Sequence, residues 1–261
     1  MRLEWGGQAV EVREAGSGPA LVLVHGYPLD GAMWSGVART LAARFRVLKP
    51  DLPGRGENPA AASGDIESYA DFLEALVEAF PSPVGVAGFS MGGYVTLALL
   101  RRRPENVRAV AFVDTRAEAD DAEGQKKRDE AIATVRSDGV AKIADGMVPR
   151  LLSEAALGNR DLVERVRRVI LRQKPETVAS DLSAMRGRRD STDLLAGLGR
   201  PALVLVGEKD TLTPPALSER MAAAIPGAKL VTIPGAGHLT PMERPGAVAA
   251  ALGEFFAGAL V

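Results

Sequence analysis

The chain has 261 residues, of which 46% are hydrophobic and 25% are charged, and its formal net charge is −1. This composition is typical of a globular domain that can bury a large core. The near-neutral charge argues against a nucleic-acid partner or an anionic membrane. The chain has no cysteine, which excludes disulfides, thiolate catalysis and cysteine metal sites, and two histidines leave little for a histidine metal centre.

The N-terminal residues 1–6 lack the basic start and apolar core of a signal peptide, and no apolar run reaches membrane-spanning length. These observations predict a cytoplasmic protein. Basic residues cluster at 101–103 and 186–189 without interleaved aromatic residues, which predicts solvated helix surface in both places. The oligomeric state is left open between a monomer and a weak dimer.

The first part of the chain alternates predicted strands with predicted helices. Residues 2–5 and 9–13 predict a strand pair joined at Gly6-Gly7. Short apolar runs predict strands at residues 20–24, 46–48, 84–87 and 107–113. The spacing of apolar residues predicts helices at residues 37–45, 66–80 and 94–100, the second of them capped by Asp65. Proline and glycine mark residues 50–59 as a loop.

The alternation stops near residue 117 and resumes after residue 200. Its second part comprises predicted strands at residues 202–206 and 229–233 and predicted helices at residues 216–224 and 246–256. Such alternation predicts an α/β fold with a mostly parallel sheet and helices on both faces.

Residues 117–190 have helical periodicity only, and they follow the sixth predicted strand directly. In open α/β sheets, ligands bind at the carboxyl ends of the strands. We therefore predict a core formed by residues 1–116 and 191–261 and an inserted helical cap at residues 117–190. The alternative is that these helices only pack against the sheet.

The segment Gly88-Phe89-Ser90-Met91-Gly92 lies between a predicted strand and a predicted helix. This context is typical of a nucleophile elbow, in which a sharp turn after a strand exposes the serine hydroxyl. The glycines are required because side chains would clash in so tight a bend. The helix start behind Ser90 offers N–H groups to developing negative charge. The motif predicts acyl transfer on Ser90.

A serine hydroxyl is a poor nucleophile unless a base and an orienting group activate it. His25 and His238 are the only histidines. His238 follows the last predicted strand within residues 234–238, at the sheet edge where the elbow is expected, so we predict that it is the general base. His25 precedes Ser90, whereas hydrolases with this elbow have the order serine, acid, histidine, so we expect His25 to brace its loop.

Two aspartates compete for the role of the orienting acid. Asp210 follows predicted strand 202–206 and Asp114 follows predicted strand 107–113, and both lie between Ser90 and His238 in the chain. We favour Asp210, because Asp114 could instead anchor the entry into the cap. In either case the carboxylate holds the imidazole tautomer and stabilises the imidazolium.

The loop that begins at His25 predicts the donors for an oxyanion. The backbone N–H of Tyr27 can point toward the serine. Together with the N–H of Met91 it would form an oxyanion hole, in which one donor is typically worth on the order of 10²–10³ in rate.

Several further stretches resemble the α/β-hydrolase superfamily, and the resemblance covers nearly the whole chain. Beyond the elbow they are LVHGYPLD at 23–30, PDLPGRG at 50–56, DTRA at 114–117 and GAGH at 235–238. The set is similar to bacterial carboxylesterases related to 3-oxoadipate enol-lactonases. The resemblance implies a small esterase with a four-helix cap and the triad Ser90, Asp210 and His238.

The same resemblance narrows the reaction class. Haloalkane dehalogenases and soluble epoxide hydrolases of this fold use aspartate where Ser90 stands, so those activities are disfavoured. One glycine follows His25, whereas many lipases have three, which by resemblance argues against bulky tertiary-alcohol esters.

The leading hypothesis is a serine carboxylesterase that hydrolyses short-chain carboxylic esters with water and needs no cofactor or metal. The first alternative is a lactone hydrolase like 3-oxoadipate enol-lactonase, whose anionic substrate would pair with Arg116 at the mouth of the cap. The second, from a different class, is a small-molecule receptor with negligible turnover. We expect the substrate to contact an apolar cluster in the cap, which comprises Met147, Val148, Leu151 and Leu152; alternatively, these side chains form the core of the cap.

Overall fold

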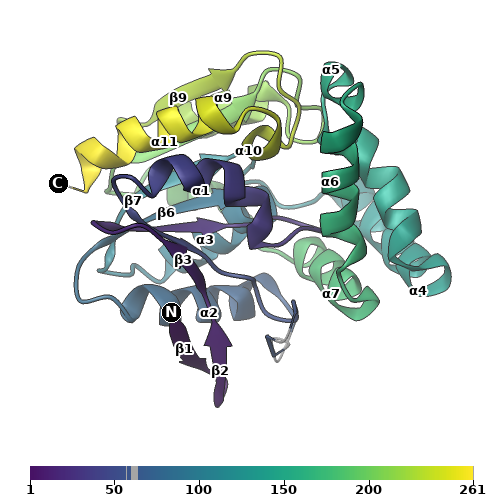
Figure 1. Ribbon diagram of the computed structural model, residues 1–261, viewed down its shortest axis with the longest axis horizontal. Helices are drawn as coiled ribbons and strands as arrows, with labels where there is room; N and C mark the ends of the chain where they lie inside the picture. The colour runs from purple at the N-terminus through teal and green to yellow at the C-terminus, as the bar shows by residue number, and fades with distance from the viewer. Residues whose placement is uncertain (57, 60–63, 261) are drawn as a thin grey trace.

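The protein is described by a computed structural model that covers residues 1–56, 58–59 and 64–260, so Glu57 of the predicted loop lies outside the described residues. Its centre is a seven-stranded sheet with the order β3-β5-β4-β6-β7-β8-β9 (Figure 1). Neighbouring strands are parallel except for β3, which is antiparallel to β5. The predicted α/β fold with a mostly parallel sheet is therefore confirmed.

Strands and helices follow one another along the chain in the predicted alternation. The strands are β1 (Arg2–Trp5), β2 (Gln8–Glu11), β3 (Arg13–Ala15), β4 (Ala20–Val24), β5 (Arg46–Lys49), β6 (Val84–Phe89), β7 (Val107–Val113), β8 (Ala202–Gly207) and β9 (Lys229–Ile233). The helices are η1 (Gly31–Trp34), α1 (Ser35–Leu41), α2 (Ile66–Glu78), α3 (Met91–Arg101), α4 (Ala122–Leu151), α5 (Glu154–Leu157), α6 (Arg160–Leu171), α7 (Pro175–Arg186), α8 (Thr192–Leu195), α9 (Pro215–Ala224), α10 (Thr240–Glu243) and α11 (Pro245–Ala259).

The N-terminal strands differ in one respect from the prediction. β1 and β2 pair as an antiparallel hairpin, as expected, but Arg13–Ala15 forms the separate strand β3 on the edge of the main sheet. All three residues of β3 are exposed, so no apolar pattern marks this strand in the sequence. The predicted sixth strand is consequently β7 of the structure.

Helix boundaries also differ where local geometry changes. The helix predicted at residues 37–45 is α1 of the structure, which is shorter and ends at Leu41. The 3₁₀ turn η1 precedes α1, and the Asp30 side chain caps this turn by accepting a hydrogen bond from the Ala32 N–H at 2.9 Å. The single turn α10, directly after the His238 loop, was not predicted.

Helices cover both faces of the sheet. Gly85 and Gly88 are three residues apart on β6, so they face opposite sides. Gly85 lies against Phe256 of α11, whereas Gly88 lies against Thr96 of α3. β4 and β6 are buried along their whole length, as expected for parallel strands with both faces covered.

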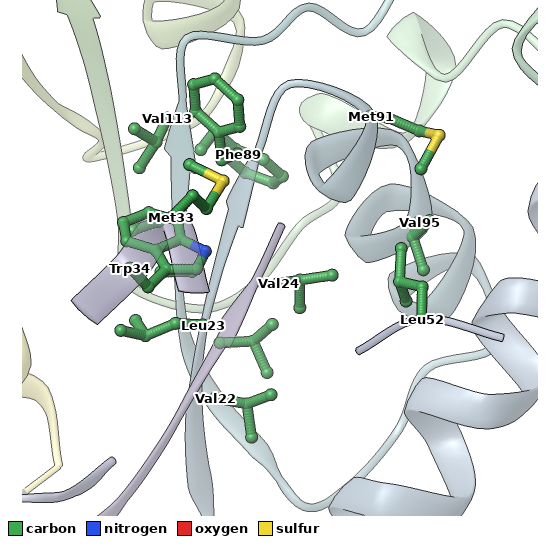
Figure 2. Close-up of a cluster of buried hydrophobic side chains, with 14 of the residues drawn as sticks. Val22, Leu23, Val24, Met33, Trp34, Leu52, Phe89, Met91, Val95 and Val113 are labelled. Carbon is green, nitrogen blue, oxygen red and sulfur yellow. The ribbon is translucent and has the colours of Figure 1, made fainter. Parts of the chain in front are cut away.

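The buried core reaches directly to the end of β6. Figure 2 shows Trp34 and Phe89 on one side of the central strands and Met91 and Val95 on the other. The rings of Trp34 and Phe89 pack edge to face, with their centroids 6.3 Å apart. Because Phe89 precedes Ser90, this packing fixes the end of the strand that presents the serine.

Helices α4 to α7 lie together at one end of the sheet, on the right in Figure 1. Residues 114–201 are all described, and they contain no strand. Helix α4 is kinked at Gly139, whose φ of 79° is strained for other residues. The division into a core and a cap at residues 117–190 stays a prediction. In the described part of the chain, no helix combines the length and apolar character needed to cross a membrane.

One of the two basic clusters is not simply solvated surface. Arg101 and Arg102 form partly exposed ion pairs with carboxylates of neighbouring helices, whereas Arg188 is 7% exposed. The guanidinium of Arg188 pairs with Asp120 at 2.9 Å and lies 4.2 Å from the ring centroid of Tyr94. The prediction of a solvated face was therefore wrong for Arg188, because its partners lie far away in the sequence.

The predicted N-cap of α2 gives a first test. The Asp65 carboxylate accepts the Ser68 N–H at 2.7 Å, and the Ser68 hydroxyl oxygen accepts the Asp65 N–H at 3.2 Å. We expect Asp65→Ala to lower the free energy of unfolding by about 1 kcal/mol, measured as a lower urea midpoint. Asp65→Asn keeps a hydrogen-bond acceptor, so its free energy of unfolding should fall less than that of Asp65→Ala. An equal loss of stability in both variants would contradict the capping role.

Candidate active site

Ser90 lies at a strained turn between β6 and α3. Its φ of 50° and ψ of −115° are unfavourable for a residue with a side chain, at a cost on the order of 1–3 kcal/mol. The Ser90 N–H donates to the Val113 carbonyl at 2.9 Å, which ties the turn to β7. A methyl group on Gly92 would lie 2.5 Å from the Val24 carbonyl oxygen, so the turn needs glycine there. The geometry is that of the predicted elbow.

His238 lies in the loop after β9, and its ring reaches Ser90. The His238 Nε2 is 3.0 Å from the Ser90 Oγ, although 148 residues separate the two in the chain. His238 is 3% exposed, and its ring centroid lies 5.1 Å from that of Phe89. The residue before the serine therefore also supports the imidazole.

Asp210, in the loop after β8, completes the hydrogen-bonded chain. The His238 Nδ1 lies 2.8 Å from the Asp210 Oδ2. The other oxygen, Oδ1, accepts the N–H groups of Leu212 and Thr213 at 2.8 and 2.9 Å. Burial opposes ionisation of Asp210, but the His238 ring and the hydrogen-bond donors outweigh it and lower the pKa of Asp210. The carboxylate is thus held charged beside the imidazole.

Thr213 is part of this arrangement, although it is not among the site residues predicted from the sequence. Its hydroxyl donates to the Asp210 Oδ2 at 2.7 Å, and its Oγ1 lies 3.2 Å from the His238 Nδ1. The available signal was the threonine three positions after the aspartate, since aspartate side chains in turns accept N–H groups of residues that follow closely. Thr213 fixes the carboxylate in the orientation that His238 requires.

Asp114, the competing acid, is engaged elsewhere. Its carboxylate accepts the Gly207 N–H at 2.8 Å and the Thr240 hydroxyl. Burial, and then the negative charge of Asp210, raise the pKa of Asp114 well above its ordinary value. Asp114 therefore joins the ends of β7 and β8 to α10, and the aspartate that contacts His238 is Asp210.

His25 braces the loop after β4, as expected from the sequence. Its Nδ1 lies 3.0 Å from the Gly26 carbonyl, and its Nε2 accepts the Leu52 N–H at 3.0 Å. The ring is fully buried, and burial together with the positive charge of Arg55 lowers the pKa of His25 from about 6.5 to about 3. A neutral, doubly hydrogen-bonded imidazole is suited to a structural role.

The two amides predicted for an oxyanion hole belong to residues near Ser90 in the structure. Met91 is the first residue of α3, so its N–H has no acceptor within the helix. The loop of Tyr27 passes close to the serine: a methyl group on Gly26 would lie 3.0 Å from the Ser90 Cβ. Tyr27 also lines the cavity above Ser90. The assignment of both N–H groups as oxyanion donors stays a prediction.

A cavity of about 550 Å³ opens above Ser90 and His238. Much of its wall comes from α4 and α7, and it includes the predicted substrate contacts Met147 and Arg116. Leu151 and Leu152 are not among the lining residues in the described part of the chain. Both are at most 4% exposed, in the packed interior, which agrees with the alternative that they belong to the core of the helical segment. We therefore leave them out of the candidate substrate site.

The cavity wall has a surplus of positive charge. Its cationic side chains are Arg116, Lys127, Arg128, Lys142 and Arg150, and its anionic side chains are Asp120, Asp121 and Glu123. The Arg116 guanidinium donates to Asp120, so its charge is already paired, although its Nε is buried without a partner among the described residues. Among the described residues, no group of three or more histidine, aspartate or glutamate side chains could hold a metal ion.

Comparison with known proteins gives a consistent family. The sequence matches the alpha/beta hydrolase fold family over residues 19–245. A pimeloyl-[acyl-carrier protein] methyl ester esterase of Nitrosomonas europaea is 29% identical over 244 residues, which cover 91% of this chain and 95% of that protein. The esterase of the same name from Methylococcus capsulatus is 30% identical over 252 residues, or 94% of this chain and 98% of that one.

Solved structures show the same likeness in three dimensions. A thermophilic esterase from Thermogutta terrifontis, solved with malate bound, has a TM-score of 0.94 and 36% identity, and the match covers 100% of this chain and 99% of that one. The enol-lactonase from Burkholderia xenovorans LB400 has a TM-score of 0.89 and 26% identity, with 98% and 100% of the two chains covered.

The buried His25 predicts a pH dependence of stability. Because its folded-state pKa is lowered, the unfolded chain binds the extra proton first as the pH falls below about 6.5, so the stabilising contribution is complete above that pH and is lost toward pH 3. In His25→Gln, we expect the free energy of unfolding to fall less steeply between about pH 6 and pH 4.5, by up to about 1.4 kcal/mol per pH unit. Urea titrations at several pH values measure this slope, and identical slopes in the two proteins would contradict a neutral buried His25.

Proposed function

The chain belongs to the α/β-hydrolase fold family, and from this premise we propose that it is a serine carboxylesterase with Ser90 as its nucleophile. It is a carboxylic ester hydrolase that acts on short-chain esters. The observation that supports this most directly is the hydrogen-bonded chain Ser90–His238–Asp210, with heavy-atom distances of 3.0 and 2.8 Å, at the floor of a cavity.

The reaction follows from these contacts. The Ser90 Oγ attacks the ester carbonyl while His238 Nε2 takes its proton, and Asp210 stabilises the imidazolium that forms. The amides of Tyr27 and Met91 donate to the oxyanion of the tetrahedral intermediate. His238 then returns the proton to the leaving alcohol, and an acyl-enzyme remains on Ser90. Water, deprotonated by His238, releases the carboxylic acid and restores the hydroxyl.

The size of the cavity supports a small substrate. About 550 Å³ lies within the usual range of sites for small molecules. Apolar side chains beside Ser90 and His238 suit an acyl chain; they include Tyr27, Ile143, Met147, Leu182, Met185 and Leu212. Because similar proteins are named methyl ester esterases, a methyl ester is a suitable substrate to assay beside the p-nitrophenyl esters. A cytoplasmic location stays a prediction from the sequence.

A second candidate function is hydrolysis of an anionic ester or lactone. The surplus of positive charge on the cavity wall favours it, in particular Arg150 and Lys142, for which no ion pair is found within the described residues. Arg116 is a weaker candidate for the anion than the sequence predicted, because Asp120 already pairs with it. The ratio of kcat/KM for an anionic lactone and a neutral ester of similar size would decide between the two.

The nucleophile is tested with p-nitrophenyl esters from acetate to octanoate. We expect turnover of the shorter chains by the wild type and a loss of at least about 10³-fold in Ser90→Ala, because the proposed acyl-enzyme forms on the Ser90 hydroxyl. A serine-reactive phosphonate should add its mass at Ser90 alone. Full activity in Ser90→Ala would overturn the proposal. Tight ligand binding with negligible turnover would favour the receptor alternative.

The acid is tested by two matched substitutions. Asp210→Asn should lower kcat by about 10³–10⁴, because an amide favours the wrong imidazole tautomer. Asp114→Asn should keep kcat within about tenfold per folded molecule, since its carboxylate bonds to Gly207 and Thr240 and not to His238. The opposite ranking would assign the acid to Asp114.

A further inference from the structure

The loop that holds the Tyr27 amide is fastened to the helical segment 117–190 through Asp30. Asp30 is 5% exposed and lies three residues after Tyr27. Arg172, at the C-terminal end of α6, donates to both of its oxygens, with Nε and Nη2 at 2.5 and 2.6 Å. Gln173 adds a third bond at 3.0 Å. A two-point arginine–carboxylate contact fixes orientation as well as distance.

A second connection reaches the same loop from α7. Asp181 is 1% exposed and pairs with the guanidinium of Arg55, and the Tyr69 hydroxyl donates to it at 2.9 Å. The Nε of Arg55 in turn donates to the Leu29 carbonyl at 2.9 Å. Arg55 is itself 2% exposed, so it is a buried link between the helical segment and the backbone two residues after Tyr27.

The same helical segment also holds the loop of the general base. The Leu239 N–H donates to the Leu151 carbonyl at 2.8 Å. Glu243 accepts the Ser153 hydroxyl at 2.7 Å and the Gly237 N–H at 3.0 Å. The backbone on either side of His238 is thus fastened to the end of α4, and this is where the buried Leu151 and Leu152 lie.

From these connections we propose that residues 117–190 position the reacting groups, with Asp30 and Arg172 as positioning residues that hold the Tyr27 amide toward the oxyanion. This inference rests on the proposed esterase function. The beginning of the loop is held by the core, through His25 and Leu52. Three of the four hydrogen bonds on the Asp30 carboxylate, however, come from the helical segment. Loosening them should misplace the amide while leaving Ser90 and His238 in contact.

Arg172→Met tests the proposal, because it removes the two-point contact without altering the loop itself. We expect kcat to fall about ten- to a hundredfold while KM stays within about threefold, since the oxyanion donor acts in the transition state. The inhibition constant of an aryl trifluoromethyl ketone, which forms an oxyanion on Ser90, should rise by the same factor. Arg172→Lys keeps the charge but loses the two-point geometry. We expect its kcat and its inhibition constant for the ketone to lie between those of the wild type and those of Arg172→Met.

Arg167→Met is the matched control. Arg167 lies on the same helix and pairs with Asp145 of α4, so its loss breaks a bond inside the helical segment only. We expect kcat and the ketone inhibition constant to stay within about twofold of the wild type.

An Arg172→Met enzyme with wild-type kcat and ketone affinity per folded molecule, whatever its melting temperature, would overturn the proposal. If Arg172→Met does not fold, unchanged values in Arg172→Lys would do the same. Ser90→Ala distinguishes the proposed esterase function from the positioning role of Arg172. If turnover depends on Ser90 but the Arg172 substitutions have no effect, only the positioning role is rejected.

Discussion

The turn at Ser90 is the constraint around which the rest of the structure is arranged. The backbone leaves β6 and enters α3 within one residue of positive φ, and the loop after β4 packs directly against it. Such strain persists only when the surroundings over-determine the conformation. Here the Val113 carbonyl accepts the Ser90 N–H, and the Thr115 hydroxyl donates to the Ser90 carbonyl. The neighbouring Phe89 packs against Trp34. In the proposed mechanism, this rigid turn sets where the general base and the oxyanion donors have to lie.

The parallel sheet brings these groups to the elbow, because the loops after parallel strands meet at one edge. Two buried aspartates lie at this edge, and their surroundings shift their pKa values in opposite directions. Asp210 receives the His238 ring and three donors, which lowers its pKa, whereas burial and the charge of Asp210 raise the pKa of Asp114. Environments that shift paired carboxyl groups in opposite directions assign different roles to them.

Residues of the helical segment 117–190 line the cavity and, in our proposal, also position the reacting groups. Its polar connections end on the loops that flank Tyr27 and His238, the two groups that must face Ser90 from different strands. In our proposal, side chains of this segment that do not line the cavity, such as Arg172, therefore influence the geometry of the reaction, while others form part of the cavity wall. This would couple the part of the fold that determines substrate fit to the part that performs the chemistry.

The sequence by itself determined the alternating α/β architecture and the elbow motif, and it predicted that His238 rather than His25 faces Ser90. These features depend on local patterns: apolar periodicity, glycines in a tight turn, and the order of residues along the chain. Chain order could not separate Asp210 from Asp114, because both satisfy it. The sequence also could not identify strand β3, because its three residues are all exposed and have no apolar pattern.

Only the tertiary structure decided which aspartate faces His238, that Thr213 supports this aspartate, that Arg188 is buried, and that Leu151 and Leu152 do not line the cavity. Asp210 and His238 are 28 residues apart in the chain, and Arg188 and Asp120 are 68 apart. Contacts of this kind are set by how strands and helices pack against one another, and no short stretch of sequence contains that information.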